Sequence, residues 1–420
     1  MSRYLCAIFI ALLVTPSAHA QESETLSLAT ARSLALTHQP LLQAQSAAVV
    51  AARQSAIASG QLPDPVLSGG LTDLTVTGSD RLTLRNESDT QFQAGIKQQF
   101  FGGDKRKLRG QRAGYVADGL DAELEESRRM IARESGMGWI DVWKALRAQS
   151  VVEESIAQAK LQEQTVMIAY TNNRASQAEV LTARVAVELL NDQLASFQQM
   201  EWHARNQLRR WIGDAAERPL QMNLPDWPTP NLDQMLTHLA NHPHVQIQSA
   251  AVDAAKTSLD LAQADYSPDY SVMAGYGYRP GFADYASISF EIGLPFFTAN
   301  RQDRGVAAAS SQLNEADQKR EDWLKQHRAE ITLNVSDWNR LQQRFIRYDT
   351  AILPQAQNRM DAALAAYSAG QGTLTAVLDA RRSLLDIRMQ RLDLEADSAR
   401  HQISLAYFNH EASAPAGDQP

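Results

Sequence analysis

Three histidines near the middle of the chain are the side chains whose type and spacing come closest to a chemical site. His238 and His242 are one helical turn apart and His244 follows; imidazole nitrogens bind zinc and copper. Two observations weaken a metal site: Pro243 predicts a helix start at this point, and the parallel position in a related segment is Gln39. We therefore predict no metal site and keep the three histidines as weak candidates.

Other catalytic patterns are missing from the sequence. It contains no Gly-rich phosphate loop, no serine elbow and no His-Glu-x-x-His pattern. Cys6 is the only cysteine, and the formal net charge is −8. A single thiol at the start of the chain excludes disulfides and cysteine nucleophiles from the rest of it, and a mildly acidic chain gives no sign of a nucleic-acid partner. We predict neither an enzyme nor a cofactor.

The first twenty residues are organised as a secretory signal peptide. Arg3 precedes an apolar run from Tyr4 to Val14, and a small-residue site ends at Ala20. We expect residues 1–20, including Cys6, to be removed. No later run of 18 apolar residues occurs, so no transmembrane helix is expected. An exported bacterial protein of this kind is either soluble in the periplasm or a β-barrel of the outer membrane, whose strands give a weaker hydropathy signal.

Long helices with heptad seams are predicted for most of the chain. No proline occurs between Pro65 and Pro219. Apolar residues recur three and four apart from Val180 to Trp211 and from Leu378 to Ala406, the pattern of helices packed as coiled coils. A soluble helical bundle would also explain these seams.

The chain repeats itself. "PLLQAQSAAVVAARQS" (40–55) returns 203 residues later as "PHVQIQSAAVDAAKTS" (243–258), and "YTNNRASQAEVLTAR" (170–184) returns as "YSAGQGTLTAVLDAR" (367–381). Repeats of this kind indicate a duplicated architecture. We predict two structural repeats, residues 21–212 and 243–410, with a linker at 213–242 and a flexible tail at 411–420.

Each repeat contains a predicted β-hairpin, at residues 66–100 and 268–295. Four segments alternate between apolar and polar residues, at 66–77, 90–97, 269–278 and 286–294. They have about the length that a tilted strand needs to cross a bilayer, with the alternation of a membrane barrel. Four strands cannot close a barrel, and an open edge in lipid leaves backbone groups unpaired. If these strands lie in a membrane, several chains must share one barrel, and a trimer would supply twelve strands from six repeats.

With these features together, the chain resembles the TolC family of outer-membrane efflux ducts. The stretches that carry the resemblance are "LPDPVLSGG" (62–70), "GLPFFTANRQDRGVA" (293–307) and "AYSAGQGTLTAVLDARRSLL" (366–385). The resemblance implies a mainly α, internally duplicated homotrimer, with a long coiled-coil α-helical barrel and a shared 12-stranded transmembrane β-barrel. Residues 213–242 and the tail would form an equatorial belt.

The resemblance also implies the function. It predicts a passive exit duct in the outer membrane of a Gram-negative bacterium, extending into the periplasm. Its partners would be outer-membrane lipid, a periplasmic adaptor and an inner-membrane resistance-nodulation-division pump. "LPFFTANRQDRGV" and the lone "PDP" look most like the heavy-metal subgroup. The alternatives are the same duct in drug efflux or type I protein secretion, and a periplasmic coiled-coil protein without a pore.

Within the family the helices converge at the periplasmic end, where carboxylates form a constriction. Asp379 falls at the matching position, whereas a second acidic position of relatives falls on Ala376. A ring of carboxylates attracts cations and repels anions. We predict that Asp379 and Glu179 line this gate, and that Arg184 and Arg381 hold neighbouring coils closed through ion pairs. Solvated charges at helix ends, in surface pairs worth under about 1 kcal/mol, would explain the same residues.

The tips of the helical hairpins are the predicted contacts for the adaptor. By the resemblance, the contact residues are Asn172, Asn173, Arg174, Gly370, Gln371 and Gly372. Asn173 and Gly370 fall where a left-handed residue would end one helix. Ser176 and Thr373 fall where a side chain would cap the next.

Pro354 predicts an interruption in the second repeat that the first repeat lacks. It lies inside a helical pattern at 340–367, where the first repeat has Ala157. A proline inside a helix costs about 3 kcal/mol, so we predict two helices there.

Overall fold

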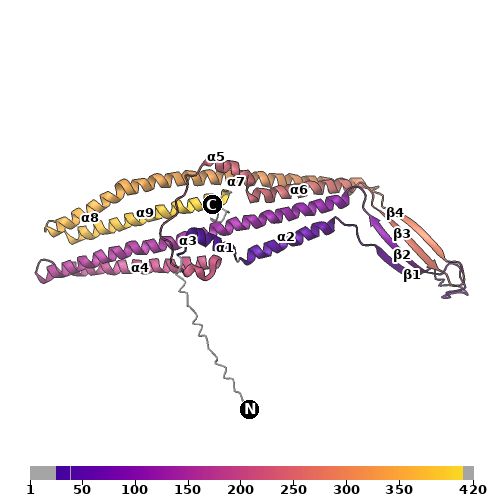
Figure 1. The fold of residues 1–420 in the computed structure, drawn as a ribbon, viewed down its shortest axis with the longest axis horizontal. Coiled ribbons are helices and arrows are strands. Elements are labelled where there is room, and N and C mark those ends of the chain that lie inside the picture. Colours follow the sequence, from indigo (N-terminus) through magenta and orange to yellow (C-terminus); the bar gives the residue numbers. More distant parts are fainter. Residues whose placement is uncertain (1–24, 38, 410–420) are drawn as a thin grey trace, which may run out of the picture.

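The computed structural model describes residues 25–37 and 39–409. The predicted signal peptide, at 1–20, and the predicted tail, at 411–420, lie outside the described residues. The molecule is elongated: helices run along its length, with helical tips at one end and a sheet at the other (Figure 1). A mainly helical fold with a small sheet is confirmed.

Two long helical hairpins form the body. The longest helix, α3, has 67 residues and is therefore about 100 Å long. Helices α3 and α4 form one hairpin, and α7, α8 and α9 form the other (Figure 1). The helices are α1 (Leu28–Thr37), α2 (Pro40–Ser59), α3 (Lys105–Thr171), α4 (Gln177–Ile212), α5 (Leu232–His238), α6 (Pro243–Ala264), α7 (Gln302–Arg347), α8 (Leu353–Ser368) and α9 (Leu374–Phe408).

The interruption predicted at Pro354 is present and takes the form of a π-helical turn. This turn spans Tyr348–Ile352 and separates α7 from α8, with Pro354 in the first turn of α8. Proline has no N–H and its ring crowds the carbonyl four residues earlier, which is Thr350. The wider turn accommodates this conflict. Helix α3, with Ala157 in the matching place, continues without a break.

Four antiparallel strands form the sheet, in the order β1-β2-β3-β4. The bounds are β1 (Val66–Thr72), β2 (Gln91–Phe100), β3 (Tyr270–Tyr278) and β4 (Tyr285–Ile292). Strands β1 and β2 form one predicted hairpin, and β3 and β4 form the other. The two hairpins also pair with each other through β2 and β3, from Phe92 opposite Tyr278 to Phe100 opposite Tyr270.

Two strand boundaries differ from the prediction by three residues or more. Strand β1 ends at Thr72 and does not reach residue 77, because Asp73 adopts a positive φ of 57°, which ends the ladder. Strand β2 continues to Phe100, beyond residue 97, because β3 supplies a second partner strand. The rings of Phe100 and Tyr270 stack at 5.3 Å across this pairing.

The main hydrophobic core lies at the middle of the body, where α1, α4 and α9 pack around α3. Trp139 and Trp143 of α3 are fully buried. Gly136 permits close approach, since a Cβ there would lie 3.3 Å from Ile403 of α9. Residues 213–242 pack onto this region: Leu220 bridges to Leu26, and the Trp143 indole donates to the Met222 carbonyl at 2.9 Å.

Candidate functional site

The two helical tips, which the sequence analysis singled out, have the same backbone geometry. At the α3–α4 tip Asn173 has a φ of 56°, and the Arg174 N–H donates to Ala169. At the α8–α9 tip Gly370 has a φ of 72°, and the Gln371 N–H donates to Ala366 at 2.9 Å. This is the Schellman ending of a helix. The predicted left-handed residues are confirmed.

The helix that follows each tip is capped as predicted. The Ser176 hydroxyl accepts from the Glu179 N–H, and the Glu179 carboxylate accepts from the Ser176 N–H at 2.8 Å, which completes a capping box. The Thr373 hydroxyl accepts from the Ala376 N–H at 3.2 Å. These caps fix the shape of both tips.

The predicted adaptor contacts lie on the outer surface of these turns. Asn172, Asn173, Arg174, Gly370 and Gln371 are exposed, and Gly372 is half-buried. A side chain could not be added at Gly372 without a shift, since a Cβ would lie 3.1 Å from the Tyr367 nitrogen. The backbone of this tip is therefore closely packed.

The two tips are packed against each other. Val166, Val180 and Leu374 are buried in one apolar cluster, against which Tyr367 is packed. Burial raises the pKa of Tyr367, and the charge of Glu179 raises it further. Glu179 of one tip therefore lies near Tyr367 of the other.

The predicted gate residues occupy different environments. Asp379 is exposed on α9 and shares a crevice between α3, α4 and α9 with Arg381; its volume is about 550 Å³. The Nε and Nη1 atoms of Arg381 are buried without a hydrogen-bond partner among the described residues, and burial lowers the pKa of this guanidinium. Arg184 pairs with Glu163 of α3 at 3.3 Å, across its own hairpin. Glu163 carries no sequence signal that would have identified it.

The three candidate histidines have polar and aromatic neighbours. His242 is buried, while His238 Nδ1 lies 3.2 Å from Asn409 Oδ1 and His244 Nε2 lies 3.2 Å from Gln248. Within 25–37 and 39–409, no three His, Asp or Glu side chains are placed to hold a metal. Their surroundings are aromatic: His242 and His244 both stack against Trp323.

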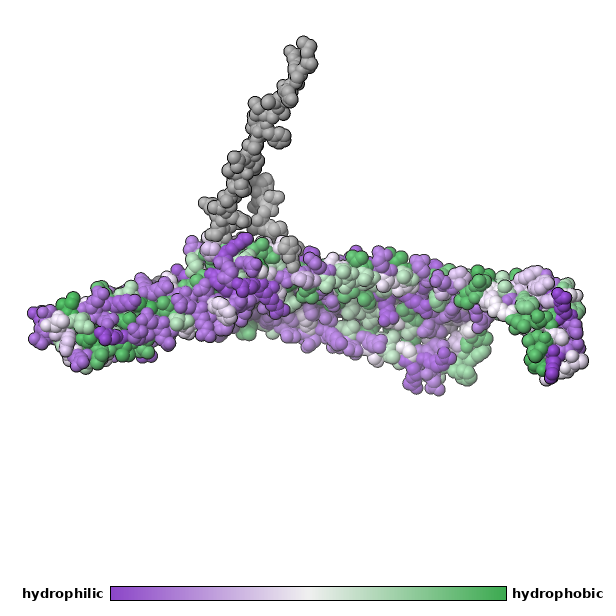
Figure 2. All heavy atoms as spheres, turned by 90° about the horizontal axis from the view of Figure 1, so that it is seen from below, coloured by the Kyte–Doolittle hydropathy of each residue, from purple (hydrophilic) through white to green (hydrophobic). Residues whose placement is uncertain are grey.

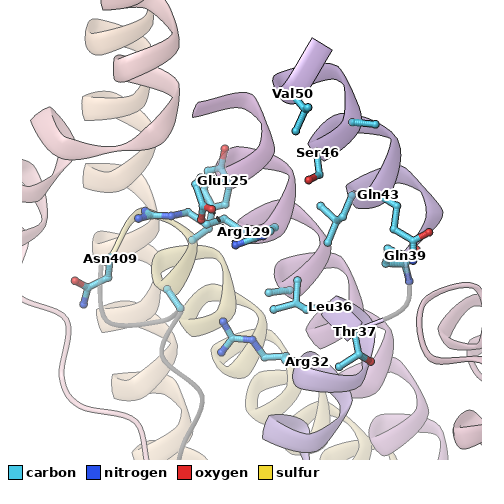
Figure 3. Close-up of a pocket in the computed structure, with 16 residues that line it drawn as sticks. Arg32, Leu36, Thr37, Gln39, Gln43, Ser46, Val50, Glu125, Arg129 and Asn409 are labelled. Atoms are coloured by element: carbon cyan, nitrogen blue, oxygen red, sulfur yellow. Dashed lines mark hydrogen bonds and ion pairs between the residues drawn. The ribbon is translucent and has the colours of Figure 1, made fainter. Parts of the chain in front are cut away.

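A pocket lies at mid-length, lined in part by Tyr407 and Asn409, which contact these histidines. It has a volume of about 700 Å³ and is enclosed by α1, α2, α3 and the end of α9. Figure 3 shows Glu125 and Arg129 of α3 on one side of it, and Gln43 and Ser46 of α2 on another. Its lining is mixed in charge, so the pocket by itself does not indicate a ligand.

The register of the sheet places all four predicted apolar faces on one side. Leu67 lies opposite Ile96, Ile96 opposite Ala274, and Ala274 opposite Ile288. The other side carries polar residues, including the ion pair between Lys97 and Glu291. Figure 2 shows hydrophobic and hydrophilic residues on separate sides of this end of the molecule.

The apolar side of the sheet is exposed to an unusual degree. Leu67 is 80 % exposed, and Ile288 and Phe290 are 72 % and 73 % exposed. Large apolar patches that nothing covers mark contact with another apolar phase or molecule. Among the described helices, none is apolar over enough of its length to cross a membrane.

Comparison with known proteins agrees with this geometry. Residues 237–407 match the model of the family described as "Outer membrane efflux protein". No curated protein matches the chain significantly. The match lies in the second half of the chain, from α5 to the end of α9.

Solved structures match over almost the whole chain. CusC is 19 % identical, with 91 % of each chain covered and a TM-score of 0.76. VceC of Vibrio cholerae is 20 % identical, with 91 % of this chain and 95 % of that chain covered and a TM-score of 0.76. CmeC of Campylobacter jejuni is 14 % identical, with 93 % and 87 % covered and a TM-score of 0.76.

At these identities the likeness is one of fold. The prediction of a non-enzymatic protein agrees with the efflux-protein family that residues 237–407 match. The chain has the fold of outer-membrane channels, and its residues 237–407 carry the sequence pattern of the outer membrane efflux protein family.

Proposed function

We propose that this protein is the outer-membrane exit duct of a tripartite efflux system. The observation that carries the proposal is the sheet. Its four strands present one continuous apolar face, and among residues 25–37 and 39–409 no strand pairs with the outer edge of β1 or of β4. In a bilayer the hydrocarbon chains of the lipid would contact this apolar face. An unpaired edge in lipid leaves backbone groups without hydrogen bonds, each at a cost of several kcal/mol.

Closure of the barrel by three copies would give the backbone groups of both edge strands hydrogen-bond partners. Strand β4 of one copy would pair with β1 of the next, and three sheets of four strands would give a 12-stranded barrel. The two tips, with matching turns and caps, support a ring of six similar hairpins built from two repeats per chain.

The helical body supports the same assembly. Leu181, Val185 and Leu189 are spaced four apart on α4 and are 50 %, 58 % and 65 % exposed in the single chain. Apolar residues at this spacing form a stripe on one face of a helix. We infer that neighbouring copies cover this stripe when the helices form a barrel in the periplasm.

The tips would contact a periplasmic adaptor through Asn172, Asn173, Arg174, Gly370, Gln371 and Gly372, and the adaptor would connect the duct to a resistance-nodulation-division pump. Asp379 would line the gate, since its carboxylate is exposed. Glu179 would contribute at the same level, although its carboxylate also caps α4.

We propose heavy-metal cations as the cargo, because carboxylates at a constriction favour cations and "LPFFTANRQDRGV" resembles the metal subgroup. The same duct in drug efflux or type I secretion is the alternative. Neighbouring genes for an adaptor and a proton-driven pump, with or without a metal sensor, would distinguish these cargo classes.

The test is to purify the mature protein in detergent, determine its mass and record its conductance in planar bilayers. We expect a trimer that forms cation-preferring channels. A monomer that is water-soluble without detergent and forms no channels would refute the duct.

A further inference from the structure

Four elements meet at one buried junction in the middle of the body. His242, the N-cap of α6, is 1 % exposed, and its ring packs against Trp323 of α7 and against Tyr407 and Phe408 of α9. Glu126 of α3 lies on the other side, with its Oε2 atom 3.6 Å from His242 Nδ1. We call these residues, together with His244 and His327, the junction cluster.

The histidines of the junction cluster are stacked on a single indole. The His244 ring lies 4.7 Å from Trp323 at an interplanar angle of 8°, and the His327 ring lies 3.9 Å from it at 19°. The centroids of His244 and His327 are 6.5 Å apart. Three imidazoles thus lie close together, so each bound proton would repel the next.

The other titratable and charged groups of the junction act on His242 or on its neighbours Tyr407, His327 and Asn409. Helix α3 contributes Glu126, Arg129 and Arg133; α6 contributes His244; α7 contributes His327 and Glu330; and α9 contributes Tyr407, while His238 at the end of α5 contacts Asn409. Glu126 is shared: it accepts from the Tyr407 hydroxyl, and its Oε1 atom lies 3.8 Å from His244. Two carboxylates, Glu126 and Glu330, face three imidazole rings, so they cannot neutralise all three rings when each is protonated.

Burial determines the protonation state of His242 at neutral pH. Burial lowers the pKa of His242 to about 4, although the charge of Glu126 opposes the shift. Burial alone would raise the pKa of Glu126, but contacts with His244 and Tyr407 and the charge of His242 lower it below its ordinary value. At pH 7 His242 is therefore neutral, and its contact with Glu126 is not an ion pair.

We propose that the junction cluster is a pH-responsive latch, which fastens the end of α9 and the start of α6 to α3 near neutral pH and releases them in acid. Ala406 and Tyr407 also line the pocket of about 700 Å³, which gives the released end of α9 space to move. The latch does not depend on the protein being a duct.

The expected size of the effect follows from the two protonation equilibria. His242 has a pKa of about 4 in the closed junction and 6.5 when exposed to solvent. Because the closed-state pKa is the lower one, stability is fully present above pH 6.5 and is lost as the pH falls towards 4. From this residue alone, linkage predicts an equilibrium constant for opening of the junction that is about thirtyfold larger at pH 5.0 than at pH 7.5.

Hydrogen exchange of the full mature protein in detergent tests the latch. Protection, corrected for intrinsic exchange, is compared at pH 7.5 and 5.0 for residues 242–249 and 403–408, with tip residues 180–187 as internal control. We expect about thirtyfold lower protection at pH 5.0 in the two junction segments and little change at the tip. His242→Gln should abolish the difference, whereas His203→Gln, at an exposed histidine of α4, should retain it.

Three outcomes would overturn the proposal: equal protection at both pH values in the unsubstituted protein, an equal loss at the tip, or a His242→Gln protein that keeps the difference. If His242→Gln does not fold, His242→Asn takes its place, because asparagine is a preferred N-cap residue and does not titrate in this pH range. It should also abolish the difference between pH 7.5 and pH 5.0. A His242→Asn protein that keeps the difference would refute the latch as well.

Discussion

A lysine at Ile288 is expected to prevent assembly in the membrane, whereas a lysine at the next residue, Ser289, is expected to be tolerated. The two positions are neighbours in the middle of β4 and both are exposed in the single chain. They differ in the face of the sheet: Ile288 lies opposite Ala274 on the apolar side, and Ser289 lies opposite Met273 on the other side.

The free-energy cost of each lysine depends on what its face of the sheet contacts in the proposed barrel. A lysine on the lipid face costs about 2–4 kcal/mol near the bilayer midplane. Three copies raise this to about 6–12 kcal/mol per trimer, which is comparable with the 5–15 kcal/mol that stabilises a typical domain. On the polar face, beside Lys97 and Glu291, the ammonium stays in water and the cost is close to zero.

The assay is assembly of refolded protein into lipid vesicles, followed by the yield of detergent-resistant trimer and by the channel conductance. We expect Ile288→Lys to lose most of both and Ser289→Lys to retain both. Equal assembly of the two variants would show that the apolar side of the sheet does not contact lipid, and the membrane role of the strands would be wrong.

Three further variants test the gate, the tip and the core. Asp379→Ala should reduce the cation preference of single channels; an unchanged preference and conductance would remove Asp379 from the gate. Ser176→Ala removes the capping box and should destabilise the start of α4 by about 1 kcal/mol, seen as faster amide exchange confined to that tip. Trp143→Phe leaves the Met222 carbonyl without the indole donor and should lower stability by about 1–3 kcal/mol in thermal melts. Trp202→Phe, at a tryptophan that is 64 % exposed, is its control and should have no measurable effect.

Several structural features were accessible from the sequence because they depend on neighbours along the chain. The π-helical turn before Pro354 follows from a missing N–H. The left-handed residues Asn173 and Gly370 and the cap at Ser176 follow from local backbone preferences. The alternation in 286–294 predicted a strand with one apolar face, and β4 has this face. Whether the chain is duplicated and trimeric, and whether Asp379 forms a gate, stay predictions, because they concern copies and partners.

Other features were decided only by the tertiary structure, because they join residues that are distant in the sequence. The pairing of β2 with β3 aligns the two hairpins into one sheet, and no local pattern specifies that register. Glu126 meets Tyr407 across 281 positions, and His242 and His244 acquire their aromatic surroundings from α7 and α9. From the sequence these histidines were only weak candidates for metal ligands. Packing buries His242 among stacked rings and lowers its pKa. His242 is therefore a neutral core residue at pH 7, and protonation in acid would destabilise its burial.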